Sequence, residues 1–304
     1  MQDNRGIIAV FGASGRQGGG VVRALKAQGR FRVRAVSRNL ARIEGLGADE
    51  VAVADLTSPE TLGPAFAGAH GAFVVTNFWE GPGIDELAQG RAAVDAARAA
   101  GVEHFTWSTL PNVEEISGSA FDVPHFTQKA RVESLVAKAG FHAYTFVEAP
   151  FYFQNLTGQM APQRQEDGSR MWALPMAQNA RVIHMGDINE LGDVVAGAFA
   201  NPEKVGAGQH LALAGDLVSW ADLVETLNQQ GHNVKFRSVP AEVFDNFFPG
   251  AREISEMMRY FEAHTYFGPH ADDKIALARE VSTAPPTSFA DWAREHLPVE
   301  GGAP

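Results

Sequence analysis

The fold is decided by the stretch Ile7-Ile8-Ala9-Val10-Phe11-Gly12-Ala13-Ser14-Gly15-Arg16-Gln17-Gly18. Its first five residues are apolar, which is too short a run for a helix and typical of a buried strand. Glycines then stand at every third position, and apolar residues at helical spacing follow them. Gly12 permits a tight turn, Gly15 lets the backbone approach a pyrophosphate, and Gly18 lets the new helix pack closely on the sheet.

This turn predicts a dinucleotide site, because the free N–H groups and the positive dipole end of the new helix face the anion. A plain strand-to-helix turn would also tolerate glycines. Here, however, a second strand at Arg32–Ser37 closes a βαβ unit of about 30 residues, the context that the fingerprint requires. We assign six residues of the turn to the cofactor: Gly12, Ser14, Gly15, Arg16, Gln17 and Gly18.

Strands and helices alternate as far as residue 147. The predicted strands are 51–53, 72–75, 104–108 and 142–147, and the predicted helices are 58–66, 85–100 and 123–139. Ser58 is the expected cap of the first of these helices, with Pro59 at its first position. Such alternation predicts an α/β fold, a Rossmann-type doubly wound parallel sheet with right-handed crossovers.

After Pro150 the regular alternation of strands and helices ends. Helices are predicted at 189–199, 220–230, 251–263, 274–280 and 289–296, strands at 209–214 and 234–239, and a disordered tail at 301–304. We expect residues 1–153 to form the NADP-binding domain, with 182–206 returning to it. Residues 154–181 and 207–304 then form a smaller α+β region at the carboxyl ends of the strands, where ligands bind in open α/β sheets.

Composition narrows the class of protein. The chain has 304 residues, a formal net charge of −11 and no cysteine. The acidic charge argues against direct nucleic-acid binding, and the lack of cysteine excludes disulfides and thiol chemistry. No apolar run reaches the ~18 residues of a membrane span, and no signal peptide, metal-binding histidine spacing or nucleophile-elbow motif is evident. We therefore expect a cytoplasmic protein without membrane or metal.

The residue after the second strand indicates which dinucleotide binds. NAD sites usually place an acidic residue there, whereas this strand ends in Ala35-Val36-Ser37-Arg38-Asn39. A guanidinium at position 38 offers a planar fork to a 2′-phosphate, with Arg16 and Arg42 as further candidates. We therefore expect NADP(H) in preference to NAD(H), although Arg38 as a solvated loop residue is the alternative.

Topology adds residues at the ends of the next two strands. Asp55, followed by Leu56, is placed to accept from the adenine amino group, or else to cap the next turn. Thr76 and Asn77 should lie over the path from ribose to diphosphate, and Asn77 has the alternative role of holding the loop that follows.

Further segments carry a family resemblance: Val75-Thr76-Asn77-Phe78-Trp79-Glu80, His125-Phe126-Thr127-Gln128-Lys129, Phe151-Tyr152-Phe153-Gln154-Asn155-Leu156, Phe248-Pro249-Gly250-Ala251-Arg252-Glu253 and Met258-Arg259-Tyr260. With the glycine turn and Arg38, they resemble the NmrA-like family of atypical short-chain dehydrogenases over nearly the whole chain. The segments from residue 248 onward are especially similar to its NADPH-sensor branch, the HSCARG-type proteins with an NmrA-like domain. The resemblance implies that Phe78 also belongs to the cofactor site.

Orthodox short-chain dehydrogenases use a Tyr-x-x-x-Lys pair, in which the tyrosine moves the proton. This chain has His125-x-x-x-Lys129. Lys129 can still hold the nicotinamide ribose, or be a solvated helix lysine. His125 is a candidate catalytic residue because imidazole titrates near neutrality, but the resemblance implies that histidine here belongs to sensors and regulators.

Further residues are expected near the nicotinamide end. Ser108 stands in the place of the substrate-polarising serine, or else caps the end of its strand and contacts the ribose. The backbone groups of the segment Glu148-Ala149-Pro150-Phe151 should fix the face of the nicotinamide ring. Asn155 is expected at the pocket mouth together with Tyr152 and Phe153.

Three functions remain open from the sequence. The resemblance implies a redox sensor that binds NADP(H) and signals to a protein partner through the loops 76–83 and 151–168. The second is an NAD(P)H-dependent oxidoreductase that reduces a small carbonyl, imine or quinone-like substrate, with His125 or a water in place of tyrosine. The third, direct transcriptional regulation, is disfavoured by the acidic charge. A homodimer stays open, since no self-complementary surface can be read from the sequence.

Overall fold

The structure is a computed structural model that describes residues 4–81, 83–158 and 160–298. The tail 301–304, for which we expect disorder, lies outside the described residues.

Among the described residues, seven parallel strands form the central sheet in the order β11-β6-β5-β4-β1-β2-β3. They are β1 (Ile7–Phe11), β2 (Arg32–Ser37), β3 (Glu50–Val53), β4 (Ala69–Val74), β5 (His104–Thr109), β6 (Ala143–Glu148) and β11 (Ala207–Ala212). The order reverses between β1 and β4, which is the switch point where such sheets bind ligands.

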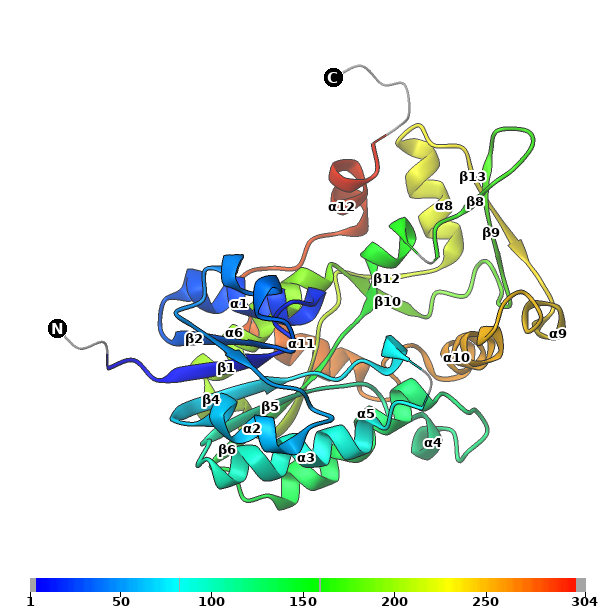
Figure 1. The fold of residues 1–304 in the computed structure, drawn as a ribbon. Helices are drawn as coiled ribbons and strands as arrows, with labels where there is room; N and C mark the ends of the chain where they lie inside the picture. The colour runs from blue at the N-terminus through cyan, green and yellow to red at the C-terminus, as the bar shows by residue number, and fades with distance from the viewer. Residues whose placement is uncertain (1–3, 82, 159, 299–304) are drawn as a thin grey trace.

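Helices cover both faces of this sheet (Figure 1). One face packs against α1 (Arg16–Gln28), α6 (Leu191–Ala200) and α11 (Ala271–Val281). The other packs against α2 (Leu62–Phe66), α3 (Glu86–Ala99) and α5 (Pro124–Lys138). The predicted doubly wound Rossmann-type fold is confirmed.

The glycine turn has the predicted close contacts. Gly12 adopts a φ of +69°, in the left-handed region that favours glycine. A Cβ on Gly18 would lie 2.3 Å from the carbonyl oxygen of Gly12, closer than real Cβ atoms approach. Gly15 precedes α1 with extended backbone (φ −92°, ψ 175°), so the helix starts directly behind the turn.

Over the residues that the structure describes, the smaller region contains two three-stranded sheets and its own apolar core. The sheets run β12-β10-β7 and β13-β9-β8, with β7 (Phe151–Tyr152), β8 (Gln163–Arg164), β9 (Arg170–Leu174), β10 (Ile183–Gly186), β12 (Asp216–Val218) and β13 (Val234–Ser238). Its helices are α8 (Trp220–Gln229), α9 (Ala241–Phe244), α10 (Ala251–His264) and α12 (Phe289–His296). These elements form the second lobe in Figure 1.

Short helices connect the larger elements: α4 (Val113–Ile116), α7 (Pro202–Val205) and the 3₁₀ turns η1 (Leu40–Arg42), η2 (Glu44–Leu46), η3 (Pro59–Thr61), η4 (Phe78–Glu80), η5 (Phe153–Thr157) and η6 (Ile188–Glu190). The predicted helix 58–66 is therefore wrong in detail. It is a 3₁₀ turn followed by α2, and the side chain of Ser58 caps neither.

The carboxyl-terminal half of the chain returns to the central sheet twice. Helix α6 packs on α1, where the Cβ position of Gly192 lies 2.2 Å from the carbonyl oxygen of Gly20. Strand β11 pairs with β6 and α11 covers it, although both fall in the range 207–304 that we expected in the smaller region. The physical reason is that the edge of β6 and the apolar face beside it need covering, which β11 and α11 supply.

No helix in the described residues is both long and apolar enough to cross a membrane.

Candidate functional site

A cleft of about 470 Å³ lies at the carboxyl ends of β1 to β4. It brings together most of the residues that we predicted for the adenosine and diphosphate: Gly12, Ser14, Gly15, Arg16, Gln17, Gly18, Arg38, Asp55, Leu56, Thr76 and Asn77. These residues come from four separate strand ends. We call this cavity the dinucleotide cleft.

Arg38 forms an ion pair with Glu80, a contact that the sequence did not predict. Its Nη1 and Nη2 donate to the two carboxylate oxygens of Glu80 at 2.8 and 2.7 Å. Glu80 belongs to η4, far from Arg38 in sequence, and it lines the same cleft together with Arg16 and Arg42. The adenosine end of the cleft therefore contains three guanidinium groups and two carboxylates, those of Glu80 and Asp55.

Asp55 stabilises the turn that follows β3, which was the alternative to a contact with adenine. Its Oδ1 accepts from the backbone N–H and the hydroxyl of Thr57, at 2.9 and 2.8 Å. Burial raises the pKa of Asp55, but the hydrogen bonds from Thr57 outweigh this and hold the pKa below its usual value. The carboxylate therefore stays ionised at neutral pH, and the contact with adenine stays a prediction.

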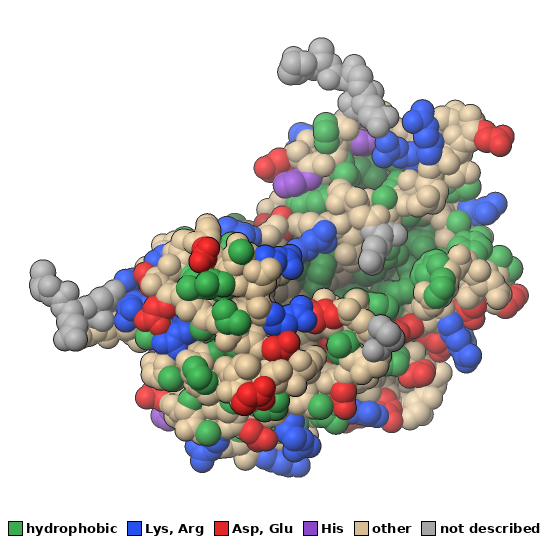
Figure 2. All heavy atoms as spheres, viewed as in Figure 1, with side chains coloured by type: hydrophobic (Ala, Val, Ile, Leu, Met, Phe, Trp, Pro, Cys, Tyr) green, Lys and Arg blue, Asp and Glu red, His purple; other side chains and the backbone are tan. Residues whose placement is uncertain are grey.

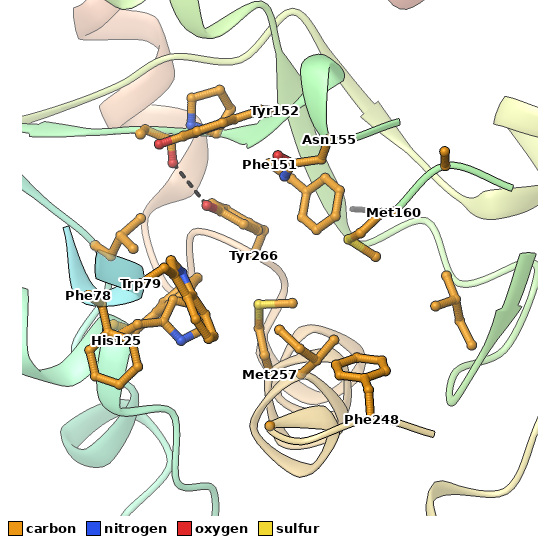
Figure 3. Close-up of a pocket in the computed structure, with 18 of the residues that line it drawn as sticks. Phe78, Trp79, His125, Phe151, Tyr152, Asn155, Met160, Phe248, Met257 and Tyr266 are labelled. Carbon is orange, nitrogen blue, oxygen red and sulfur yellow. Dashed lines mark hydrogen bonds between the residues drawn. The ribbon is translucent and has the colours of Figure 1, made fainter. Parts of the chain in front are cut away.

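The larger cavity adjoins this cleft and measures about 1020 Å³. Figure 2 shows its hydrophobic side chains in the hollow between the two lobes. Our candidates for the nicotinamide end line it: Phe78, Ser108, His125, Lys129, Pro150, Phe151 and Asn155. In Figure 3, Phe78, Trp79 and His125 lie on one side of this cavity, and Met160 and Phe248 lie on the other.

Four residues line both cavities: Gln17, Thr76, Asn77 and Tyr152. At this junction the Ser108 hydroxyl donates to Gln17 Oε1 at 2.7 Å, and Gln17 Nε2 donates to the Tyr152 hydroxyl at 2.7 Å. Burial raises the pKa of Tyr152, although the bond from Gln17 opposes the shift. We had placed Tyr152 only at the pocket mouth. In the sequence, the only indication that Tyr152 faces the cofactor path was its place shortly after the carboxyl end of β6.

Lys129 is buried rather than solvated. Its ammonium donates to the backbone and side-chain oxygens of Thr76, at 2.8 and 2.9 Å, and forms an ion pair with the buried Glu86 of α3. An ammonium has three donors, and these contacts employ all of them. Burial lowers the pKa of Lys129 and Glu86 opposes this. Holding a ribose would therefore require Lys129 to exchange one of these partners.

His125 is fixed from two sides. Its Nδ1 lies 2.5 Å from Oε1 of Glu253 on α10, and its ring lies 5.1 Å from that of Trp79 and 5.9 Å from that of Phe78. A carboxylate only accepts hydrogen bonds, so Nδ1 carries the proton and neutral His125 presents Nε2 as an acceptor. Donation of a proton to a substrate would require the imidazolium form.

Glu148, which we assigned to the cofactor, lines neither cavity. Its buried carboxylate accepts from Nδ1 of His210 at 2.8 Å and pairs with Lys274 at 2.9 Å. The Glu148 side chain thus contacts His210 of β11 and Lys274 of α11, and a contact of its backbone with the cofactor stays a prediction. His210 Nε2 also lies 3.6 Å from Glu133, which accepts a 2.6 Å bond from Thr109.

The contribution of this cluster to stability falls between acid and neutral pH. Burial raises the pKa of Glu133 to about 7. Burial lowers the pKa of His210, but the bond to Glu148 and the charge of Glu133 raise it overall. At this cluster the native state holds more protons than the unfolded chain from about pH 4.5 to about 7, so its contribution to stability falls as the pH rises, by up to about 1.4 kcal/mol per pH unit for each proton. The buried His104 and His184, whose pKa values burial lowers to about 4, contribute in the opposite sense over the lower part of this range.

We expect the stability of Glu133→Gln relative to the wild type to rise from pH 5 to pH 7 and then to level off, measured as the free energy of unfolding in urea at pH 5, 6, 7 and 8. Glu114→Gln, which removes an exposed carboxylate paired with Arg131, is the control that should keep the wild-type slope. Equal slopes in all three proteins would contradict the prediction.

Known proteins resemble this chain along its whole length. The sequence profile of the NmrA-like family matches residues 4–293. An NmrA-like family domain-containing protein of Dictyostelium discoideum is 28% identical, over 95% of this chain and 97% of its own length. The NmrA-like family domain-containing oxidoreductase FrzB of Cladobotryum sp is 32% identical, over 91% of this chain and 92% of its own.

A solved structure has the same fold. NmrA, a negative transcriptional regulator in complex with NADP, superposes with a TM-score of 0.82 at 25% identity, covering 98% of this chain and 97% of NmrA. NmrA has also been solved in complex with NAD. The assignment to the sensor branch remains a prediction. The profile match and the shared fold show that this chain belongs to the NmrA-like family.

Proposed function

We propose that this protein binds NADP(H) in the dinucleotide cleft and acts as a cytoplasmic redox sensor through a protein partner, with little or no dehydrogenase activity. The cleft fits the cofactor, because the glycine turn leaves no Cβ where the diphosphate approaches α1. Arg16, Arg38 and Arg42 at the adenosine end suit a 2′-phosphate. The NADP and NAD complexes of NmrA support this reading.

The observation that carries the regulatory part is the state of the His125–Lys129 pair. Tyrosine is absent from position 125, Lys129 has all its donors on Thr76 and Glu86, and His125 is held by Glu253. Lys129 therefore has no donor to spare for a substrate, and neutral His125 offers Nε2 only as an acceptor. Binding or release of the cofactor in the dinucleotide cleft would instead affect a partner protein through the loops 76–83 and 151–168, which border both cavities.

The test combines binding and turnover. Purified protein should change the fluorescence of NADPH on binding, and incubation with quinones, aldehydes and dyes should leave NADPH unconsumed. Turnover that His125→Ala abolishes would overturn the sensor and establish the enzyme.

A second function, an NAD(P)H-dependent oxidoreductase, is favoured by the apolar cavity of about 1020 Å³ that adjoins the cleft. The name of FrzB, an oxidoreductase, supports it. The substrate would be a carbonyl, imine or quinone-like molecule whose reacting atom lies beside Gln17 and Tyr152. If turnover is found and Tyr152→Phe abolishes it while His125→Ala does not, the proton comes from Tyr152.

We expect Arg38→Ala to weaken NADPH binding about 30-fold and NADH binding less than threefold, because only NADPH offers a phosphate for a charge-assisted pair worth about 2 kcal/mol. Fluorescence titration measures both affinities. Arg91→Ala, an exposed arginine of α3 outside the cleft, is the control. Equal losses for the two dinucleotides would remove Arg38 from the 2′-phosphate.

A further inference from the structure

The short turn η4 lies between the two cavities. Glu80 lines the dinucleotide cleft, while Phe78 and Trp79 line the larger cavity. Asn77 caps the turn by accepting a bond from the Trp79 N–H at 3.1 Å, and Asn77 itself lines both cavities. Three consecutive side chains are thus divided between two binding spaces, so a shift of η4 changes both.

Glu80 occupies the donors that a 2′-phosphate would use. Both Nη atoms of Arg38 donate to its carboxylate, in the two-bond arrangement that guanidinium forms with carboxylates and phosphates alike. A phosphate and a carboxylate cannot occupy the same pair of donors, and their charges repel each other. A ribose 2′-hydroxyl carries no charge and donates a hydrogen bond, which a carboxylate accepts.

We propose that Glu80 is a specificity-determining residue that competes with the 2′-phosphate for Arg38. This rests on the proposed dinucleotide binding. NADP(H) displaces Glu80 from Arg38 and moves η4, whereas NAD(H) leaves the ion pair in place and offers its 2′-hydroxyl to Glu80. Glu80 thereby fills, from β4's side of the cleft, the place that an acid at the end of β2 takes in NAD sites.

The exchange needs little energy, because the ion pair is exposed. The side chains of Arg38 and Glu80 keep 54% and 30% of their accessible surface, and pairs of this kind are weak and screened by salt. A dianionic phosphate beside three arginines is the stronger competitor.

The displacement reaches the second lobe through aromatic contacts. Trp79 and Phe78 lie against His125, and His125 bonds to Glu253 in the first turn of α10. The same helix contributes Ile254 and Met257 to the wall of the larger cavity. Moving η4 therefore alters the contacts between the lobes at the point where a partner or substrate would meet the protein.

The first test is Glu80→Gln, which keeps the shape and removes the charge. We expect NADPH to bind more tightly and NADH more weakly, so that the ratio of the two dissociation constants shifts about tenfold toward NADPH. Glu60→Gln, which removes an exposed carboxylate of η3 that does not line the cleft, should leave the ratio unchanged. Binding of both dinucleotides with a wild-type ratio in Glu80→Gln overturns the role of Glu80. Failure of the wild-type protein to bind either one overturns the proposed function itself.

The second test follows Trp79 directly. We compare its emission on saturation with 2′,5′-ADP and with 5′-ADP, two fragments that differ in the 2′-phosphate, and confirm saturation by calorimetry. The first should change the emission and the second should not, and Trp79→Phe should abolish the difference. Equal changes with both fragments, or none with either, overturn the movement of η4.

Discussion

Gly18→Ala should unfold the dinucleotide cleft and abolish cofactor binding. The added Cβ would lie 2.3 Å from the oxygen and 2.5 Å from the carbonyl carbon of Gly12, and 2.8 Å from the N of Ala13. All three are backbone atoms, so no side chain can rotate to relieve the collision. Either α1 moves away from β1 or the turn opens, and we expect a loss of stability of about 3 kcal/mol.

Urea denaturation and NADPH titration measure the two effects. Gly45→Ala is the matched control, because nothing lies within 4 Å of its Cβ position and its φ is not positive. A Gly18→Ala protein with wild-type stability and affinity would show that the turn does not need the close approach that defines this site.

Lys129→Met should cost about 3–5 kcal/mol of stability, the range for removing one partner of a buried ion pair. The Glu86 carboxylate is fully buried, and its second oxygen, Oε2, has no hydrogen-bond partner among the described residues. Without Lys129, only the Thr76 hydroxyl would remain to stabilise its charge.

The double variant Lys129→Met with Glu86→Leu distinguishes this explanation from simple loss of packing. Replacing both charges by apolar groups should recover most of the lost free energy, since such swaps are often neutral. Lys138→Met, an exposed lysine of the same helix, is the control in urea denaturation. If the double variant is no more stable than Lys129→Met, the unpaired charge is not the cause.

The sequence was most informative where the constraint is local. The apolar strand β1, the glycines behind it and the helix α1 are adjacent in the chain, and steric limits on the backbone allow few alternatives. The same holds for the alternation up to β6, which predicted the fold class and the residues at the strand ends. Strands β7 and β8 were not predicted because they are two residues each and carry no readable periodicity. Strands β9 and β10 were not predicted either.

The candidate site was predicted as a set of positions but not as a set of contacts. Arg38 meets Glu80, Lys129 meets Glu86, and His125 meets Glu253, each pair joined only by tertiary packing. Composition and spacing cannot reveal which acid a given cation meets. The sequence could therefore propose Lys129 for a ribose and Arg38 for a phosphate, while their present partners had to come from the structure.

The return of α11 to the central sheet has a consequence for synthesis. Ala278 and Val281 belong to the same apolar core as Ile8 and Val10, and a Cβ on Gly197 would collide with the carbonyl oxygen of Val281. A ribosome releases the glycine turn early, but the face of the sheet beside α1 stays open until residue 281 has emerged. The nucleotide-binding half therefore matures only after α11 has left the ribosome, and nascent chains that stall before α11 expose that face to chaperones or aggregation.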